Sequence, residues 1–280
     1  MTGSAGPGPV SPAPPAVGLP EAYFRPGADG EYEPTQATES PWSSAAQHGG
    51  PPTALLAHVI QERHPAPGMR IARITVEFLG TIPRVPLTAD SAVIRDGRRI
   101  RLVEASLRAG GKPVALARAW QIAVSGEGGI PVDRLAEQPP PPLPPAQADQ
   151  WFSGFANRGY LESVEWRWVH GSFDRPGGHA TTWARPRVPL VAGLPVHPQD
   201  LALIVADSAN GISGPFDPRE WLFVPPAVTV TLHRPPQGQW VCLDATTTLA
   251  ADGLGSTLGT LSDSAGLIGS VAQPLLVARH

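Results

Sequence analysis

QHGGPPTALLAHVIQ (Gln47–Gln61) places a histidine, two glycines and two prolines directly before a short apolar segment. Pro51 and Pro52 suit the first turn of a helix, where proline is tolerated, and Pro65 helps to end the helix. Between these prolines, apolar residues recur at the spacing of one helical face: Leu55, Leu56, Val59 and Ile60. The stretch therefore predicts a helix that begins at a Gly-Pro turn and buries one apolar face.

Strand patterns follow this helix. In ITVEF (Ile74–Phe78), apolar residues alternate with polar ones, which is typical of a strand with one buried face. Further strands are expected near Ala92 and over Arg101–Leu107, and a GGK turn at Gly110 leads into a strand that runs through Ile122. The first half thus predicts one helix followed by an antiparallel sheet.

The second half follows the same plan. HPQDLALIVADSANG (His197–Gly211) carries one apolar helical face, and Asn210-Gly211 is expected to end that helix. The alternating segment VTVTL (Val228–Leu232) comes next. Strands are then expected from Trp240, up to Leu261 and through Val277, with a DG turn at Asp252.

The two halves can be aligned. ITVEF (Ile74–Phe78) aligns with VTVTL (Val228–Leu232), and SLRAGGKPVALARAWQ (Ser106–Gln121) aligns without gaps with TLSDSAGLIGSVAQPL (Thr260–Leu275). This order of elements indicates an internal duplication of one helix cradled by a curved sheet. Two such units can join edge to edge into one long sheet, which protects exposed strand edges.

Two Pro-rich segments divide the chain. GPGPVSPAPPAVGLP (Gly6–Pro20) has the composition of a disordered or polyproline-like leader, and EQPPPPLPPAQADQ (Glu137–Gln150) that of a stiff linker. We therefore predict a leader over residues 1–20, an N-terminal unit over 21–135, a linker over 136–149 and a C-terminal unit over 150–280.

Composition argues against several classes of protein. The net charge of −3 gives no basic face for nucleic acid. Cys242 is the only cysteine, which rules out an internal disulfide and a multi-cysteine metal site and favours a cytoplasmic location. No segment approaches the roughly 20 apolar residues of a membrane span. The sequence also has no HExxH, no GxSxG and no phosphate-binding loop.

With HGGP opening the first helix and HRPP…W (His233–Trp240) in the second half, the duplicated plan resembles the double-hotdog acyl-CoA thioesterases. It is similar in particular to the thioesterase-like proteins common in actinobacteria, over roughly Glu21–Val277. The resemblance implies an α+β double-hotdog fold and an acyl-CoA or acyl-carrier thioester as substrate. It also implies hydrolysis without metal or cofactor, and pairing through the sheets as a homodimer.

The family's catalytic set is an Asp at the end of the second helix, a hydroxyl or amide residue before the next strand, and a Gln on the final strand. Asp207 and Gln273 match the first and the last. The residues themselves allow Asp207 to be an ordinary helix-end carboxylate. Gln273 shares a predicted strand face with apolar residues, so its amide must find a partner there, in a site or in a local structural bond.

The start of the first helix is the expected partner of the thioester. Unpaired N–H groups at a helix N-terminus carry partial positive charge and can hold a developing oxyanion. Gly49 and Gly50 would let a ligand approach the backbone, and His48 could donate a hydrogen bond. The alternative is a Pro-stiffened turn that only enters the helix.

Two positions depart from the family pattern. Pro225 stands where relatives carry Thr or Asn, and Ala227 where they usually carry Asp. Thr229 and Ser208 are candidates to replace the missing group. Two functions therefore stay open: a thioester hydrolase with an altered site, or a protein that no longer hydrolyses. The latter would bind acyl or polyketide-like ligands, or perform dehydration or cyclisation in secondary metabolism.

Overall fold

The computed structural model describes residues 18–125, 139–148, 155 and 157–280. The predicted leader lies almost wholly outside the described residues, and the predicted linker is described only over 139–148. In that segment the Gln147 side chain bonds to the backbone N–H and C=O of Trp168, at 2.8 and 2.9 Å. The segment therefore covers the outer edge of strand β9 (Val164–His170).

The N-terminal half forms an antiparallel sheet on one side of α1 (Gly50–Arg63). Its main strands, in the order β6-β7-β8-β5, are β6 (Leu87–Arg95), β7 (Ile100–Ala109), β8 (Lys112–Ala123) and β5 (Met69–Phe78). β2 (Tyr32–Pro34) and β1 (Phe24–Pro26) extend the β6 edge, while β3 (Glu39–Ser40) and β4 (Ser43–Gln47) form a separate hairpin before α1. The strands predicted from alternation are confirmed.

The C-terminal half repeats the arrangement. Its strands follow the order β12-β15-β14-β13-β10-β9: β12 (Ala227–Leu232), β15 (Gly266–Arg279), β14 (Leu254–Asp263), β13 (Val241–Leu249), β10 (His179–Pro186) and β9. β11 (Trp221–Val224) pairs with the far end of β15. The helices are α2 (Gly159–Glu162), α3 (Pro198–Ala206) and α4 (Ala209–Ile212).

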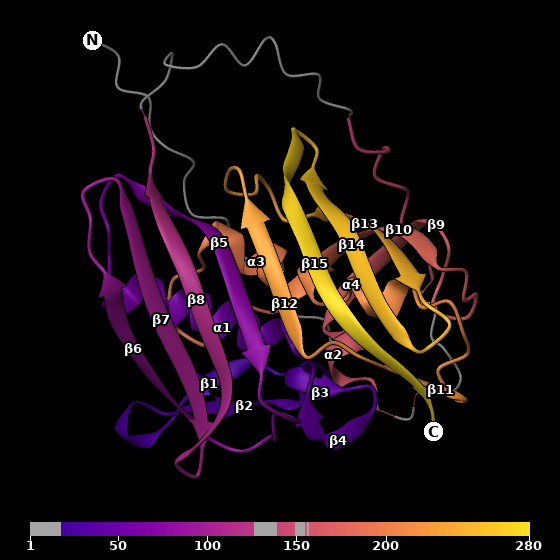
Figure 1. The fold of residues 1–280 in the computed structure, drawn as a ribbon, viewed down its shortest axis with the longest axis horizontal. Helices are drawn as coiled ribbons and strands as arrows, with labels where there is room; N and C mark the ends of the chain where they lie inside the picture. Colours follow the sequence, from indigo (N-terminus) through magenta and orange to yellow (C-terminus); the bar gives the residue numbers. More distant parts are fainter. Residues whose placement is uncertain (1–17, 126–138, 149–154, 156) are drawn as a thin grey trace.

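The halves join through β5 and β12, which lie side by side in the middle of one continuous sheet (Figure 1). Thr75 stands opposite Thr229, with their hydroxyl oxygens 3.1 Å apart. These threonines are equivalent in the internal alignment, and so are their neighbours across the sheet, Arg118 and Ala272. A pseudo-twofold axis therefore passes between Thr75 and Thr229. The predicted α+β double hotdog with edge-to-edge joining is confirmed.

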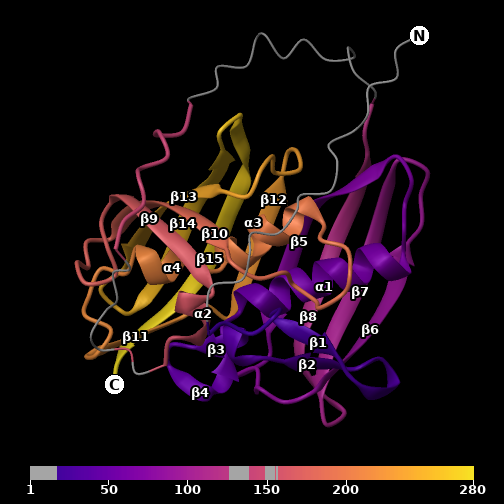
Figure 2. The same cartoon turned by 180° about the vertical axis from the view of Figure 1, so that it is seen from behind.

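Helices α1 and α3 cover the same face of the sheet and run antiparallel (Figure 2). Gly50 lies against the Ile204 carbonyl, whereas Gln61 bonds to Gln199 at the opposite end. We call these the Asp207 end and the Gln199 end. Every α1 residue from Gly50 to Ile60 is buried, more than the single apolar face predicted, because α3 packs on α1 as well as the sheet.

One helix prediction was wrong in detail. The segment His197–Gly211 is interrupted after Ala206, and Asn210-Gly211 lies inside α4 instead of ending α3. The cause is a contact from another helix: the Tyr160 hydroxyl donates to the Ile204 carbonyl at 2.7 Å, the carbonyl that the Ser208 N–H would use in a continuous helix. Ser208 donates to Val205 instead, at 3.0 Å. The tightened turn places Asp207 at the helix end.

Candidate active site

Asp207 is a nearly enclosed carboxylate at the Asp207 end, with 5% of the residue exposed. Its Oδ1 accepts a hydrogen bond from Gln273 Nε2 at 3.0 Å, and its Oδ2 lies 3.4 Å from His48 Nδ1. The backbone N–H of Gly49 also donates to this carboxylate. The predicted residues Asp207, Gln273, His48 and Gly49 therefore meet in one cluster, although they come from both halves of the chain.

Gln273 holds the turn that carries Asp207. It extends from β15 on the buried face of the sheet and is 1% exposed. Its Oε1 accepts the Asn210 N–H at 3.0 Å, so its NH₂ group must face Asp207. That NH₂ group reaches both the carboxylate and the backbone carbonyl of Asp207, the latter at 3.3 Å. Gln273 is thus a positioning residue for the carboxylate.

The two glycines are required by close packing. A Cβ on Gly49 would lie 2.6 Å from Asp207 Oδ2 and 2.7 Å from Phe78 Cζ. A Cβ on Gly50 would collide with the Ile204 carbonyl oxygen. The space that these glycines leave is filled by the end of α3. Their backbone N–H groups bond to His48 and Asp207, so they support these two side chains.

His48 has a defined tautomer. Its Nδ1 accepts the Gly50 N–H at 3.1 Å, so the ring proton of the neutral imidazole is on Nε2. The ring stacks on Tyr160, with centroids 3.7 Å apart and planes within 5°. Nε2 has no partner among the described residues, and His48 lines a cavity. His48 therefore presents an N–H donor at the cavity wall.

Ser208 and Tyr160 complete the cluster. The hydroxyl of Ser208 lies 2.8 Å from that of Tyr160, which uses its own proton for the Ile204 carbonyl. Ser208 must then donate to Tyr160, which leaves the Ser208 oxygen as an acceptor at the cavity wall. The sequence interpretation missed Tyr160, because nothing in RGYLESVEW distinguishes it from a core aromatic residue.

Burial shifts the pKa values of Asp207 and His48 in opposite directions. Desolvation raises the pKa of Asp207 to about 7, although the bonds from Gln273 and Gly49 favour its charged form. Desolvation lowers the pKa of His48 to about 3, so the imidazole stays neutral. A carboxylate that titrates near neutrality beside a neutral imidazole suits general-base chemistry.

A cavity of about 80 Å³ adjoins the cluster. His48, Ser208 and Asn210 belong to its wall, and much of the remainder is aromatic: Trp42, Phe155, Phe173, Phe216 and Phe223. Trp42 and Phe155 meet edge to face with ring centroids 5.3 Å apart. Trp42 and Phe216 are 45% and 40% exposed, so they mark the mouth of the cavity. Such a wall suits an apolar group attached to a polar reacting centre.

Thr229 is not part of the cluster. Its neighbours Val228 and Val230 point into the core, so Thr229 faces the outer side of the sheet with Thr75. Pro225 lies in the connection between β11 and β12, Ala227 is the first residue of β12, and neither contributes a polar side chain. Among the described residues, no three His, Cys, Asp or Glu side chains gather in a group that could hold a metal ion. No helix of this part of the chain is long and apolar enough to cross a bilayer.

Comparison with known families gives a consistent result. Residues 38–122 match the model of the acyl-CoA thioesterase N-terminal domain, and residues 131–277 match that of the C-terminal domain. A search of curated protein sequences finds no match.

Solved structures share the architecture. A putative thioesterase II from Thermobifida fusca is 16% identical with a TM-score of 0.70, over 92% of this chain and 96% of that one. A protein of unknown function with a hotdog fold from Alicyclobacillus acidocaldarius is 16% identical with a TM-score of 0.68, over 91% and 95%. The acyl-CoA thioesterase II of Mycobacterium marinum is 17% identical with a TM-score of 0.64, over 84% and 90%. At these identities the likeness establishes the fold.

Proposed function

The chain belongs to the acyl-CoA thioesterase family, and from this premise we propose that it hydrolyses an acyl thioester at the Asp207 end. The observation that supports this most is the buried Asp207 carboxylate, held by Gln273 and the start of α1 beside a neutral imidazole that carries its N–H on Nε2. Acyl transfer to water needs a base and an oxyanion donor, and these groups provide both.

In the proposed reaction, the Asp207 carboxylate takes a proton from water while the water oxygen attacks the thioester carbonyl carbon. His48 Nε2–H donates to the carbonyl oxygen as it gains negative charge. The tetrahedral intermediate then expels the thiolate, which takes up the proton held by Asp207. The products are a carboxylic acid and a free thiol, and Asp207 returns to its ionised form.

Ser208 takes the place of the hydroxyl or amide that relatives carry where this chain has Pro225. Its oxygen is the acceptor that the Tyr160–Ser208 bond leaves at the cavity wall, one residue from the base. A water that donates one hydrogen to Ser208 and the other to Asp207 would be fixed by two bonds. Replacing Ser208 with Ala should therefore lower turnover, by about tenfold, through loss of water orientation.

The acyl group enters the aromatic cavity. Its volume of about 80 Å³ is roughly half that of a 150 Å³ cavity known to hold benzene, which favours a short acyl group. Coenzyme A and a carrier-protein arm present the same thioester chemistry, and either can deliver it.

The direct test is thiol release by the full chain with acetyl-, butyryl-, octanoyl-, palmitoyl- and benzoyl-CoA. We expect turnover highest for the short acyl chains and lowest for palmitoyl-CoA. Phe173→Ala, which enlarges the cavity, should move the preference toward longer chains. If none of the five thioesters releases thiol above background, the hydrolytic assignment is wrong.

Pro225 and Ala227 support a second candidate, a site that binds an acyl or polyketide-like ligand without hydrolysis or performs dehydration or cyclisation. The double variant Pro225→Asn with Ala227→Asp separates the candidates. If the chain lacks hydrolysis only because these two catalytic side chains are missing, this variant should release thiol where the unmodified chain does not. High activity of the unmodified chain would exclude the second candidate.

We also propose that the chain pairs as a homodimer through the outer face of its C-terminal sheet. Leu254, Leu258 and Leu276 are 67%, 63% and 56% exposed there, beside Thr229 and Ala272. Exposed apolar clusters of this kind mark association surfaces. Light scattering should give a dimer mass for the natural chain and a monomer mass for Leu258→Glu. A monomer mass for both would reject the pairing.

A further inference from the structure

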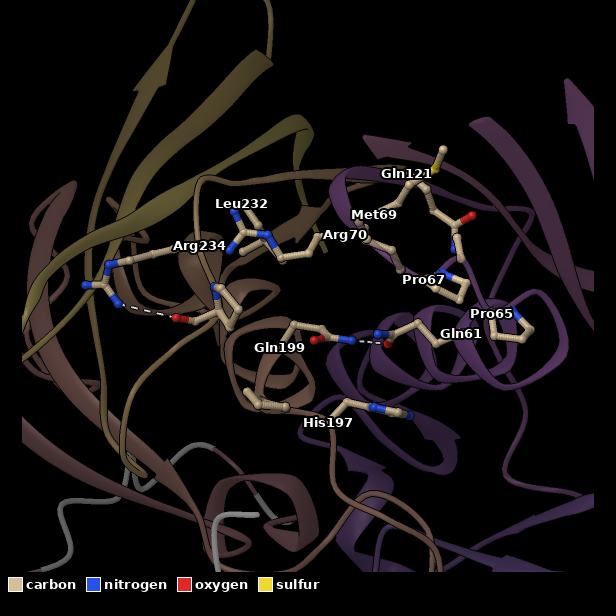
Figure 3. Close-up of a pocket in the computed structure, with 15 residues that line it drawn as sticks. Gln61, Pro65, Pro67, Met69, Arg70, Gln121, His197, Gln199, Leu232 and Arg234 are labelled. Carbon is tan, nitrogen blue, oxygen red and sulfur yellow. Dashed lines mark hydrogen bonds between the residues drawn. The ribbon is translucent and has the colours of Figure 1, made fainter. Parts of the chain in front are cut away.

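A second cavity, of about 440 Å³, lies at the Gln199 end, between the two halves (Figure 3). The pseudo-twofold axis relates the two ends of the helix pair, so this cavity lies at the end that corresponds to the Asp207 end, although different positions line it. Residues from both halves line it, among them Gln61, Arg70, Gln121, His197, Gln199 and Arg234. Its volume is within the range of small-molecule sites.

The glutamines supply amide groups to this cavity. Gln121 is 3% exposed; its Nε2 donates to the His64 carbonyl at 3.2 Å, but its Oε1 is buried with no partner among the described residues. Gln199 Nε2 donates to Gln61 Oε1, which leaves the Gln61 NH₂ group and the Gln199 carbonyl for a ligand. A buried acceptor without a donor costs free energy, so a ligand N–H at Gln121 would be favoured. Both donors and acceptors are present, as a ligand with secondary amides requires.

The charges around the cavity favour an anion. Two arginines and a histidine line it, and no Asp or Glu does. The histidine, His197, is paired with Glu62 at 2.9 Å, so the argument for an anion rests on the arginines. Arg234 is held by Asp263 through bonds of 2.6 and 2.7 Å, so it shapes the wall. Arg70 is exposed and makes one long bond, 3.4 Å to the His233 carbonyl, so its guanidinium can turn toward a phosphate. Figure 3 shows Arg70 extending between the two halves, above the Gln61–Gln199 pair.

The remaining wall is apolar. Pro65, Pro67, Ile71, Leu232 and Pro235 also line the cavity. A matching ligand has amides joined by short alkyl segments and ends in a phosphate. The phosphopantetheine arm of coenzyme A and of acyl carriers has this chemistry.

We propose that the Gln199 end binds the phosphopantetheine arm of a second coenzyme or carrier molecule and does not hydrolyse its thioester. The choice of ligand rests on the proposed function, because it assumes that the chain handles such thioesters. Catalysis is not expected at this end. Ala119 occupies the position equivalent to Gln273, and no carboxylate lines the cavity.

The test is calorimetric titration of the full chain with pantetheine, pantetheine 4′-phosphate and coenzyme A. We expect the phosphorylated arm to bind at least about tenfold more tightly than pantetheine, because Arg70 supplies a charge-assisted bond. Arg70→Ala should abolish that preference. Gln121→Glu, which keeps the side-chain shape but adds a negative charge, should weaken binding of both phosphorylated ligands. Arg108→Ala is the matched control, because Arg108 lies at the end of β7 away from this cavity. It should change neither the preference for the phosphorylated arm nor the affinity for the phosphorylated ligands.

This inference would be overturned if both phosphorylated ligands bind equally well to the natural chain, to Arg70→Ala and to Gln121→Glu. It would also be overturned if neither phosphorylated ligand binds to the natural chain. Unfolding curves of each variant establish that it is folded.

Arg70-dependent binding without thiol release from any acyl-CoA would count against the proposed hydrolysis alone. If the chain releases thiol but binds coenzyme A equally well with either substitution, the result would count against the second site alone. Pantetheine 4′-phosphate binding as tightly as coenzyme A would favour a carrier-protein arm, and tighter coenzyme A binding would favour the free coenzyme.

Discussion

The two ends of the antiparallel helix pair begin their helices in different ways. At the Gln199 end, α3 caps itself: Asp200 accepts the His197 N–H at 3.2 Å in a capping box within the same helix. At the Asp207 end, Gly49 provides no side-chain cap, and the first N–H groups of α1 bond to His48 and to Asp207 from the other half. The duplicated scaffold thus offers two equivalent positions, and only at the end without its own side-chain cap do backbone N–H groups at the helix start bond to a carboxylate of the other half.

Each end also has a His–Asp pair. His48 and Asp207 are 3.4 Å apart, and His58 and Asp200 are 3.7 Å apart. His58 and Asp200 are each 1% exposed, and neither lines a cavity that adjoins their end. His48 borders the aromatic cavity. An approach of Asp to His does not by itself define a site; access to a ligand does.

The largest expected effect comes from removing the Asp207 base. Asp207→Asn should lower thioester turnover by about 10²–10⁴-fold, the usual contribution of a general base. Asp200→Asn is the matched control on the same helix at the other end, and turnover per folded molecule should change by less than about threefold. Comparable losses in both variants would mean that the ends do not differ in function.

The next largest effect concerns the donor at the cavity wall. His48→Ala removes the Nε2–H group and should lower turnover by about 10²–10³-fold, as expected for an oxyanion donor. His48→Gln keeps an N–H donor of similar reach and should recover part of that loss. Equal activity of the Ala and Gln variants would show that His48 acts only through packing on Tyr160.

A smaller loss is expected from the positioning residue. Gln273→Ala should lower turnover by up to about 10²-fold, because Asp207 loses the bond that fixes its orientation. Thr229→Ala, on the neighbouring strand but on the outer face, should leave turnover within about twofold. A large loss in Thr229→Ala would place the reaction on the other side of the sheet.

The contact between the ends of α1 and α3 can be tested through stability. A methyl group on Gly50 would collide with the Ile204 carbonyl, so Gly50→Ala should lower the free energy of unfolding by about 2 kcal/mol or more. Gly211→Ala, in α4 with no atom within 4 Å of its added Cβ, should be neutral or slightly stabilising. Denaturant unfolding of both variants measures the difference. Similar curves would contradict the close packing.

Much of this arrangement is encoded in short-range patterns. Alternation in ITVEF and VTVTL identified β5 and β12, and the gapless alignment of the two hairpins defined the pseudo-twofold axis. The resemblance placed Asp207 and Gln273 in one catalytic set, and the structure shows that the two side chains also bond to each other. Strand alternation also carried the information that Thr229 faces outward, since Val228 and Val230 are apolar.

Other features depend on contacts between distant segments. The break between α3 and α4 is set by the Tyr160 hydroxyl, which comes from a separate short helix. The tautomer of His48 depends on one backbone N–H, and the aromatic cavity gathers residues from well-separated parts of the chain. No local pattern predicts these contacts, because each depends on the completed packing of both halves.

The most direct test of the central claim is the pH dependence of kcat/KM for butyryl-CoA. Asp207 acts as a base only when ionised, and burial raises its pKa to about 7. The rate should therefore rise with pH, pass its midpoint near pH 7 and level off above it, while Asp207→Asn leaves only a low rate without that transition. A rate that is independent of pH from 5 to 9, or a transition near pH 7 that persists in Asp207→Asn, would contradict the assignment of Asp207 as the base.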